Sequence, residues 1–245
     1  MNFFISLLFT SLLHAETPFA GRILADDSTH GGNGKLEFLT NGNMMLIRQP
    51  GEGFKRASSL IDLTTESFTQ IQHHNHSYTV VGKIEDWPKI TERPDRPAPK
   101  APKPPKVTVT EDQKEILGHK STRITVEGLG ETLEIWGATD LPAFHQWFAF
   151  CPEPFPAYRL QEQIGTLCRQ QKIFPLLITL KEGGREKTIF EVTAITPAKP
   201  NDQANPALDA RTYTLPKNHR LMRHPMQEMK RHGEEAQKLN LQKTQ

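Results

Sequence analysis

Short apolar segments follow one another at regular spacing through much of the chain, and each is ended by residues that favour a turn. In the first third of the sequence they are residues 19–24, 35–39, 44–48, 59–63, 67–72 and 77–81. The residues between them are rich in Gly, Asn and Pro. This length and spacing is typical of antiparallel strands in a meander. Asn41-Gly42 suits a type I′ turn, so we expect residues 35–48 to form a hairpin.

Strands are expected again in the second half of the chain. The segments are residues 107–110, 122–127, 132–136, 174–181 and 187–196, with a last short strand at 209–215. Glu182-Gly183-Gly184-Arg185 lies between two of them. Paired glycines between apolar runs predict a hairpin turn at this point.

Two helices are expected between the later strands. Residues 138–150 form the most aromatic stretch of the chain, with Pro142 suited to a first helical turn. Its apolar side chains recur at helical spacing and are Leu141, Phe144, Trp147 and Phe148. A second helix is expected at residues 160–168, with apolar residues on one face. Strands and helices together predict an α+β fold in which an aromatic helix covers a curved antiparallel sheet.

The N-terminal segment predicts export. Residues 3–13 are largely apolar, with no charged side chain before Glu16, and are too short to span a bilayer, which takes about 20 residues. Ala15 suits the residue before a signal-peptide cleavage site. We therefore expect residues 1–15 to be removed and the mature chain to be periplasmic or secreted. The alternative is a buried N-terminal strand or helix.

Two segments differ in composition from the rest. Residues 93–106 are rich in Pro and Lys, which is typical of an extended spacer, or of a basic arm that binds an envelope partner. Residues 217–245 are polar and basic. The predicted organisation is a signal peptide at 1–15, one domain at 16–216 interrupted at 93–106, and a tail at 217–245.

The two cysteines, Cys151 and Cys168, leave the disulfide question open. Pairs of thiols often bond in an oxidising compartment. However, the helix predicted between them separates the two by about 18 Å, and a disulfide needs Cα atoms within about 7 Å.

Catalytic motifs are absent from the sequence. It contains no Ser-nucleophile elbow, no phosphate-binding Gly loop and no zinc-spaced Cys pair. The cluster His73-His74-Asn75-His76 contains two residues, His74 and His76, that would share one face of a strand and could bind one metal ion. No third ligand is fixed nearby by spacing, and a turn with exposed imidazoles explains the cluster equally well. We therefore expect neither an enzyme nor a cofactor, and metal binding stays open. The net charge of +2 does not favour nucleic acid as a partner.

A series of short motifs resembles a known family. They are Asn43-Met44-Met45-Leu46-Ile47-Arg48, Ser59-Leu60-Ile61-Asp62-Leu63, Tyr78-Thr79-Val80, Ile116-Leu117-Gly118-His119-Lys120, Ile124-Thr125-Val126, Glu134-Ile135-Trp136 and Asp140-Leu141-Pro142. Their order over residues 19–216 is similar to that of exported bacterial proteins of unknown function with a fold like the lipoprotein carriers LolA and LolB. The resemblance implies an open half-barrel with helices over its concave face. The insertion at 93–106 and the tail depart from that pattern, and the carriers' ligand contacts do not map residue by residue.

Two functions follow as expectations. The first is a non-catalytic binding module for an apolar ligand, such as a lipid or a lipidated protein, held in a pocket lined by Leu141, Phe144, Trp147 and Phe148. The second is a structural or interaction protein of the cell envelope, in which the sheet is a scaffold.

Overall fold

The computed structural model describes residues 18–28, 34–49, 57–83, 104–128, 130–144, 164–199, 202 and 204–222. These residues build one 12-stranded sheet. The strands of the first half are β1 (Ala20–Asp27), β2 (Gly34–Asn41), β3 (Met44–Arg48), β4 (Ser58–Asp62), β5 (Ser67–Gln72) and β6 (Ser77–Lys83). Those of the second half are β7 (Lys106–Ile116), β8 (His119–Gly128), β9 (Glu131–Ala138), β10 (Phe174–Glu182), β11 (Arg185–Pro197) and β12 (Arg220–Leu221).

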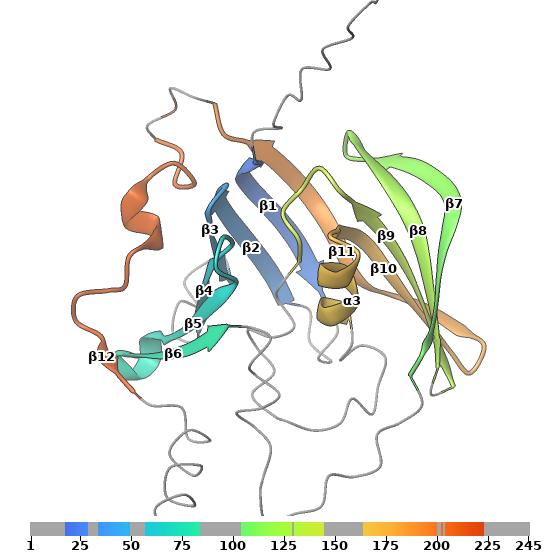
Figure 1. Cartoon of the computed structure of the whole chain (residues 1–245), viewed down its shortest axis with the longest axis horizontal. Helices are drawn as coiled ribbons and strands as arrows, with labels where there is room; N and C mark the ends of the chain where they lie inside the picture. Colours follow the sequence, from blue (N-terminus) through green and yellow to red (C-terminus); the bar gives the residue numbers. More distant parts are fainter. Residues whose placement is uncertain are drawn as a thin grey trace, which may run out of the picture.

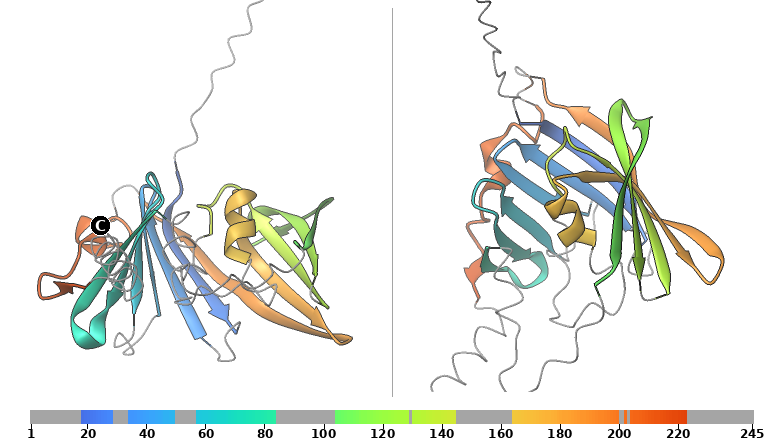
Figure 2. Two further views of the ribbon diagram at one scale, coloured as in Figure 1. Left: turned by 60° about the horizontal axis from the view of Figure 1, so that its bottom comes forward. Right: turned by 45° about the vertical axis from the view of Figure 1, so that its right-hand side comes forward.

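The sheet joins two meanders along one seam. Its order is β12-β6-β5-β4-β3-β2-β1-β11-β10-β9-β8-β7, so β1 and β11 connect the two halves of the chain. Neighbouring strands are antiparallel except for β12, which runs parallel to β6. The sheet is strongly twisted and curved, and the helix α3 (Ile164–Gln170) lies within the curve (Figures 1 and 2).

Both predicted hairpins are confirmed by strand pairing. In the β2–β3 hairpin, Thr40 pairs with Met45, and of the loop residues only Gly42 has a positive φ, of 93°. A glycine at the first central position is the type II′ pattern, so the type I′ prediction is wrong. In the β10–β11 hairpin, Gly183 and Gly184 both have positive φ, at 56° and 77°.

Apolar side chains cover both faces of the sheet. Alternate residues of a strand face opposite sides, and on β1 Ile23 and Ala25 are buried on the concave side. The concave core extends through β2, β3, β8, β9, β10 and β11 and includes buried residues of α3. A second, smaller cluster is built on Leu39, Leu46, Leu60 and Ile71, which lie on the opposite face of the first meander.

The predicted α+β class, with helices over the concave face of a half-barrel, is wrong. The described residues are mostly strand, and α3 is their one α-helix, of seven residues. Ala138, the first residue of the expected aromatic helix, belongs to β9, because it pairs with both Phe174 and Ser121. The chain then continues without helical structure through Phe144. The rest of that expected helix, residues 145–150, lies outside the described residues.

The second predicted helix is found in part. Ile164, Leu167 and Cys168 are buried on one side of α3, as expected. The helix ends because Lys172 adopts a left-handed φ of 52°, with Ile173 N–H donating to the carbonyl of Cys168 at 2.9 Å. This C-terminal cap turns the chain directly into β10. None of the helices in the described part of the chain is both long and apolar enough to cross a membrane.

The last predicted strand, at residues 209–215, is also wrong. Residues Ala210–Tyr213 form a short 3₁₀ helix, η4, which Asp209 caps by accepting a hydrogen bond from Arg211 N–H at 2.9 Å. A side chain that satisfies the backbone locally favours a helical turn over a strand. The strand that does form here, β12, lies further along the chain.

Candidate functional site

The predicted apolar site is occupied by protein side chains where the structure describes it. Leu141 is buried, and Phe144 is fully buried at 0% exposure. Trp147 and Phe148 lie outside the described residues. The Phe144 ring has its centre 5.9 Å from that of Phe38, 5.4 Å from that of Phe174 and 5.3 Å from that of Phe190. These are the spacings of a packed aromatic core.

The main chain holds Phe144 in this position. Its N–H donates to the carbonyl of Ile173 at 3.1 Å, directly before β10. Ile173 in turn packs over Gly137 of β9, where a Cβ atom would lie 2.4 Å from Ile173 Cδ1. The segment after β9 is therefore fixed against the sheet without helical structure, and it places Phe144 in the concave core.

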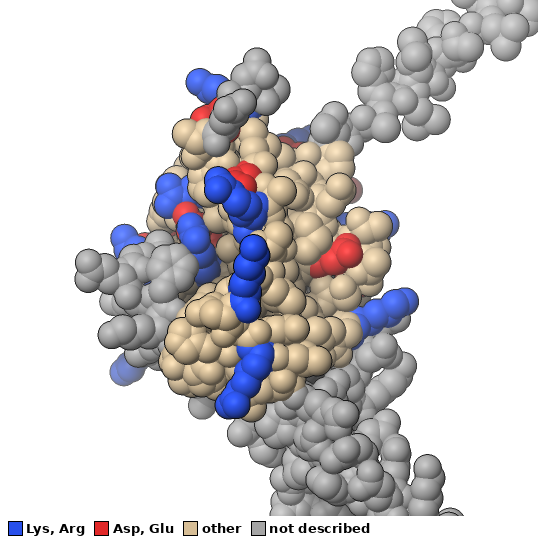
Figure 3. Space-filling model, turned by 90° about the vertical axis from the view of Figure 1, so that its left-hand side faces the viewer, with Lys and Arg blue, Asp and Glu red and all other residues tan. Residues whose placement is uncertain are grey.

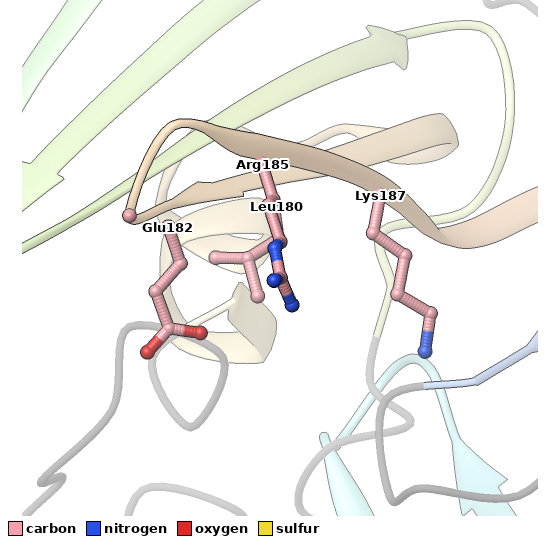
Figure 4. Close-up of a pocket in the computed structure, with 5 residues that line it drawn as sticks. Leu180, Glu182, Arg185 and Lys187 are labelled. Carbon is pink, nitrogen blue, oxygen red and sulfur yellow. The ribbon is translucent and has the colours of Figure 1, made fainter.

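An open depression of about 510 Å³ lies at the tip of the β10–β11 hairpin. It is lined by Leu180, Glu182, Gly183, Arg185 and Lys187. The labelled side chains hang from one side of the hairpin (Figure 4). Because three of them are charged, this depression does not have the apolar lining expected for a lipid site.

The opposite face of the first meander is crossed by residues 204–222, here called the strap. Ala207 and Tyr213 of the strap are buried against the apolar cluster of β2–β5. The Tyr213 hydroxyl donates to the carbonyl of Ala207 at 2.8 Å, and burial raises the pKa of Tyr213. The strap is thus a packed part of the domain (Figure 1).

The strap ends by adding a strand to the edge of the sheet. Arg220 N–H donates to the carbonyl of His76 at 2.9 Å, and Met222 N–H donates to that of Tyr78 at 2.8 Å. Arg220 and Leu221 thereby pair with Ser77 and Tyr78 as β12. These bonds use edge groups of β6 that would otherwise be open to another chain.

Three imidazoles meet under this end of the strap. The ring of His219 lies edge-on to His73, with ring centres 5.5 Å apart, and to His76, at 5.4 Å. Ser58 Oγ lies 2.8 Å from His73 Nε2, and Asn218 Nδ2 lies 3.3 Å from His76 Nδ1. His219 Nε2 is buried without a hydrogen-bond partner in the described structure.

This packing lowers the pKa of two of the imidazoles. Burial is the larger cause for both His73 and His219. Charge repulsion from His219 and His76 adds to the effect on His73, and repulsion from His76 adds to that on His219. The cluster therefore disfavours protonation. Across the described ranges no group of three His, Cys, Asp or Glu residues is arranged to hold a metal ion.

Basic side chains gather on the outer surface of the strap. Figure 3 shows Lys and Arg following one another down this side of the molecule, with Asp and Glu beside the upper ones and a further acidic patch to the right. Of the strap's own cations, Arg211 is bound by Asp209 at 2.8 Å, whereas Lys217 and Arg220 are exposed. We call the surface at this edge of the sheet, formed by Lys217, Arg220, Leu221 and Val80 of β6, the strap face; Arg220 and Leu221 are successive residues of β12 and leave it on opposite sides.

Ser58 and Cys168 carry side chains that can act as nucleophiles, and both are buried. Ser58 is within hydrogen-bond distance of His73, but it is buried in β4, where a substrate has no access. Cys168 is a free and fully buried thiol, and burial raises its pKa, so it stays protonated and unreactive. Cys151, its possible disulfide partner, lies outside the described residues.

Sequence reasoning missed the strap face and the part that His219 plays. His73 and His76 were visible as neighbours, but their third partner comes from the far end of the chain. No local periodicity marks residues 217–222, which read as polar tail. The one available signal was Leu221-Met222, an apolar pair within a basic segment.

Comparisons with known proteins identify no family. No family model matches the chain, and no curated protein matches it. Two solved structures of PNGF-II, one in space group C2 and one in P21, are similar to this chain. Their sequence identities to it are 15% and 16%, and the TM-score is 0.47 in each case. Each comparison covers 84% of this chain, which spans 31% of the PNGF-II chain.

Proposed function

We propose that this chain is a non-catalytic interaction protein of the cell envelope, with the curved sheet as scaffold and the strap face as the surface that meets an anionic partner. The envelope location rests on the apolar N-terminal segment and the predicted cleavage after Ala15. The interaction role rests on two observations. Protein side chains pack around Phe144 on the concave face, and exposed cations lie on the strap.

The main observation in support of a scaffold is the packing of Phe144. A carrier for an apolar ligand needs an empty apolar cavity, and pockets of this kind commonly have volumes of about 300–1,000 Å³. At the predicted position the ring of Phe144 instead contacts three other phenylalanines and is closed to solvent. This supports a scaffold whose contacts are made at its surface.

The partner's charge is inferred from the strap face. Lys217 and Arg220 project from a segment that packing on the sheet holds in place. The cluster of His73, His76 and His219 beneath the strap contains no acidic group that would offset these cations. A surface of fixed cations attracts anionic partners and speeds their association.

The test combines an apolar fluorescent probe with one substitution. Under this proposal the wild-type protein does not bind the probe, and Phe144→Ala destabilises the fold by about 3–5 kcal/mol, as for a phenylalanine in a filled core. Saturable probe binding by the wild type, together with a much smaller loss of stability in Phe144→Ala, would contradict it.

The apolar-ligand module is the second candidate. The observation in its favour is that Leu141 and Phe144 lie on the concave side of the sheet among the largest aromatic side chains of the core. Under this alternative Phe144 would swing aside to admit a ligand. The same probe experiment separates the two functions.

A further inference from the structure

Exposed apolar side chains are concentrated at the strap end of the sheet. Seven large apolar residues are exposed among those described, and four of them belong to β6 or the strap. These four are Val80, Leu208, Leu221 and Met222. Leu221 is 60% exposed and Val80 is 48% exposed. Single exposed apolar residues are ordinary, whereas a group of them marks an interaction site.

Two of these residues lie together on one face. Leu221 pairs with Tyr78 across the β12–β6 ladder. Val80 is two residues beyond Tyr78 on β6, so both point to the same side of the sheet. Leu221 and Val80 are therefore neighbours at the sheet edge, beside the Tyr78 side chain that packs on the strap-side core.

Cations frame this apolar pair. Lys217 and Arg220 are exposed within four residues of Leu221. Arg220 precedes Leu221 on β12 and pairs with Ser77, so its side chain leaves the opposite side of this edge strand. The edge of the sheet thus carries Leu221 and Val80 on one side of β12 and β6 and Arg220 on the other, so apolar groups and positive charge lie close together at this edge.

We infer that the strap face binds the surface of an anionic membrane. Leu221 and Val80 enter the boundary between headgroups and acyl chains, while Lys217 and Arg220 lie against the lipid phosphates. This inference rests on the proposed function and names the anionic partner of the same surface.

The exposed apolar residues favour a lipid surface over a soluble polyanion. A polymer of phosphate or sulfate groups would need only the cations and would leave Leu221 in water. A membrane offers both anionic headgroups and apolar depth, and peripheral proteins bind it through the same mixture of side chains. Each Lys or Arg close to an anionic leaflet strengthens binding roughly fivefold.

The test is sedimentation of the full chain with vesicles. One set contains equal parts phosphatidylglycerol and phosphatidylcholine, and the other contains phosphatidylcholine alone. An uncleaved apolar N-terminus would contribute to both sets, so the readout is the ratio of the two partition coefficients. We expect strong preference for the anionic vesicles, weakened by added salt.

Two double variants dissect the surface. Lys217→Gln with Arg220→Gln should lower partitioning onto anionic vesicles by roughly 25-fold, at about fivefold per charge. Val80→Ser with Leu221→Ser should lower it by roughly tenfold through lost apolar burial. The matched controls are Arg185→Gln with Lys187→Gln on the β10–β11 hairpin, and Val107→Ser with Val109→Ser on β7. Both controls should bind as the wild type does.

Inorganic polyphosphate separates failure of this inference from failure of the proposed function. If the full chain binds polyphosphate through Lys217 and Arg220 but shows no preference for anionic vesicles, the membrane inference is overturned and the anionic interface stands. If it binds neither, both fall. Equal loss of vesicle binding in the two control variants would also overturn the inference, because binding would then not be located at the strap face.

Discussion

His219 lies edge-on to His73, with their ring centres 5.5 Å apart, although one belongs to the strap and the other to the turn between β5 and β6. His76 completes the group on the other side of His219, at 5.4 Å. The contact links the end of the strap to the first meander at a point where neutral imidazoles pack and charged ones repel.

The first prediction is a loss of stability in mild acid. The pKa of His73 and that of His219 are lowered in the folded protein, chiefly by burial, so below about pH 6.5 the unfolded chain binds more protons than the folded one. The stability that depends on neutral His73 and His219 is therefore fully present above the pKa of the unfolded chain. It is lost as the pH falls from that value through the lowered pKa of the folded protein. Urea unfolding at about pH 7.5 and about pH 5 should show a lower midpoint at the lower pH.

His219→Gln tests the origin of this pH dependence. Glutamine keeps polar atoms near His76 but does not titrate, so the difference between the two midpoints should shrink. His74→Gln, from the same turn, serves as the comparison, and the difference should shrink more in His219→Gln than in His74→Gln. An unchanged pH dependence in His219→Gln would show that other groups carry it.

A second prediction concerns the docking of the strap. Tyr213→Phe removes the hydroxyl that donates to the carbonyl of Ala207 and leaves that carbonyl unpaired. We expect a loss of about 0.5–1.5 kcal/mol in the free energy of unfolding. Tyr78→Phe on β6, which is only half-buried, should have a smaller effect. A Tyr213→Phe variant as stable as the wild type would mean that this hydrogen bond does not help to hold the strap.

A third prediction concerns Glu37, which is buried on β2 between the guanidinium groups of Arg22 and Arg48. Hydrogen bonds to charged groups contribute more than neutral ones, so Glu37→Gln should cost about 1–3 kcal/mol in urea unfolding. Glu191→Gln on the exposed side of β11 is the control and should be close to neutral. If the two variants were equally stable, the Arg22–Glu37–Arg48 group would not contribute to the fold.

A fourth prediction concerns export. The mass of the mature protein recovered from an expressing cell should correspond to a chain that begins at Glu16, because Ala15 provides the small residue that signal peptidase requires. A mature protein that retains Met1 would contradict export by cleavage at this position.

Local sequence signals predicted the hairpins and missed the long-range arrangement. Gly42 and the Gly183-Gly184 pair mark turns because few other residues adopt a left-handed φ, and this is readable from the sequence. The helix expected from residue 138 was wrong at its start because ladder bonds with β8 and β10 hold Ala138 in a strand. Spacing alone does not contain that information, since the partners come from distant segments.

The candidate site was predictable only in fragments. Leu141 and Phe144 are in one core cluster, as their apolar character suggested, but the same aromatic neighbours that attracted attention fill the space a ligand would need. The strap face depends on a parallel pairing between β12 and β6, which are separated by most of the chain. Its apolar and basic residues are unremarkable in sequence and become a surface only through that pairing.

Binding to polyphosphate shows whether the strap face is the interface for an anionic partner. Retention of the full chain on immobilised polyphosphate would be measured against salt for the wild type, Lys217→Gln with Arg220→Gln, and Arg185→Gln with Lys187→Gln. We predict that the strap variant elutes at lower salt than the wild type, while the hairpin variant, with the same change in net charge, elutes with the wild type. Equal elution of the two variants would contradict the claim.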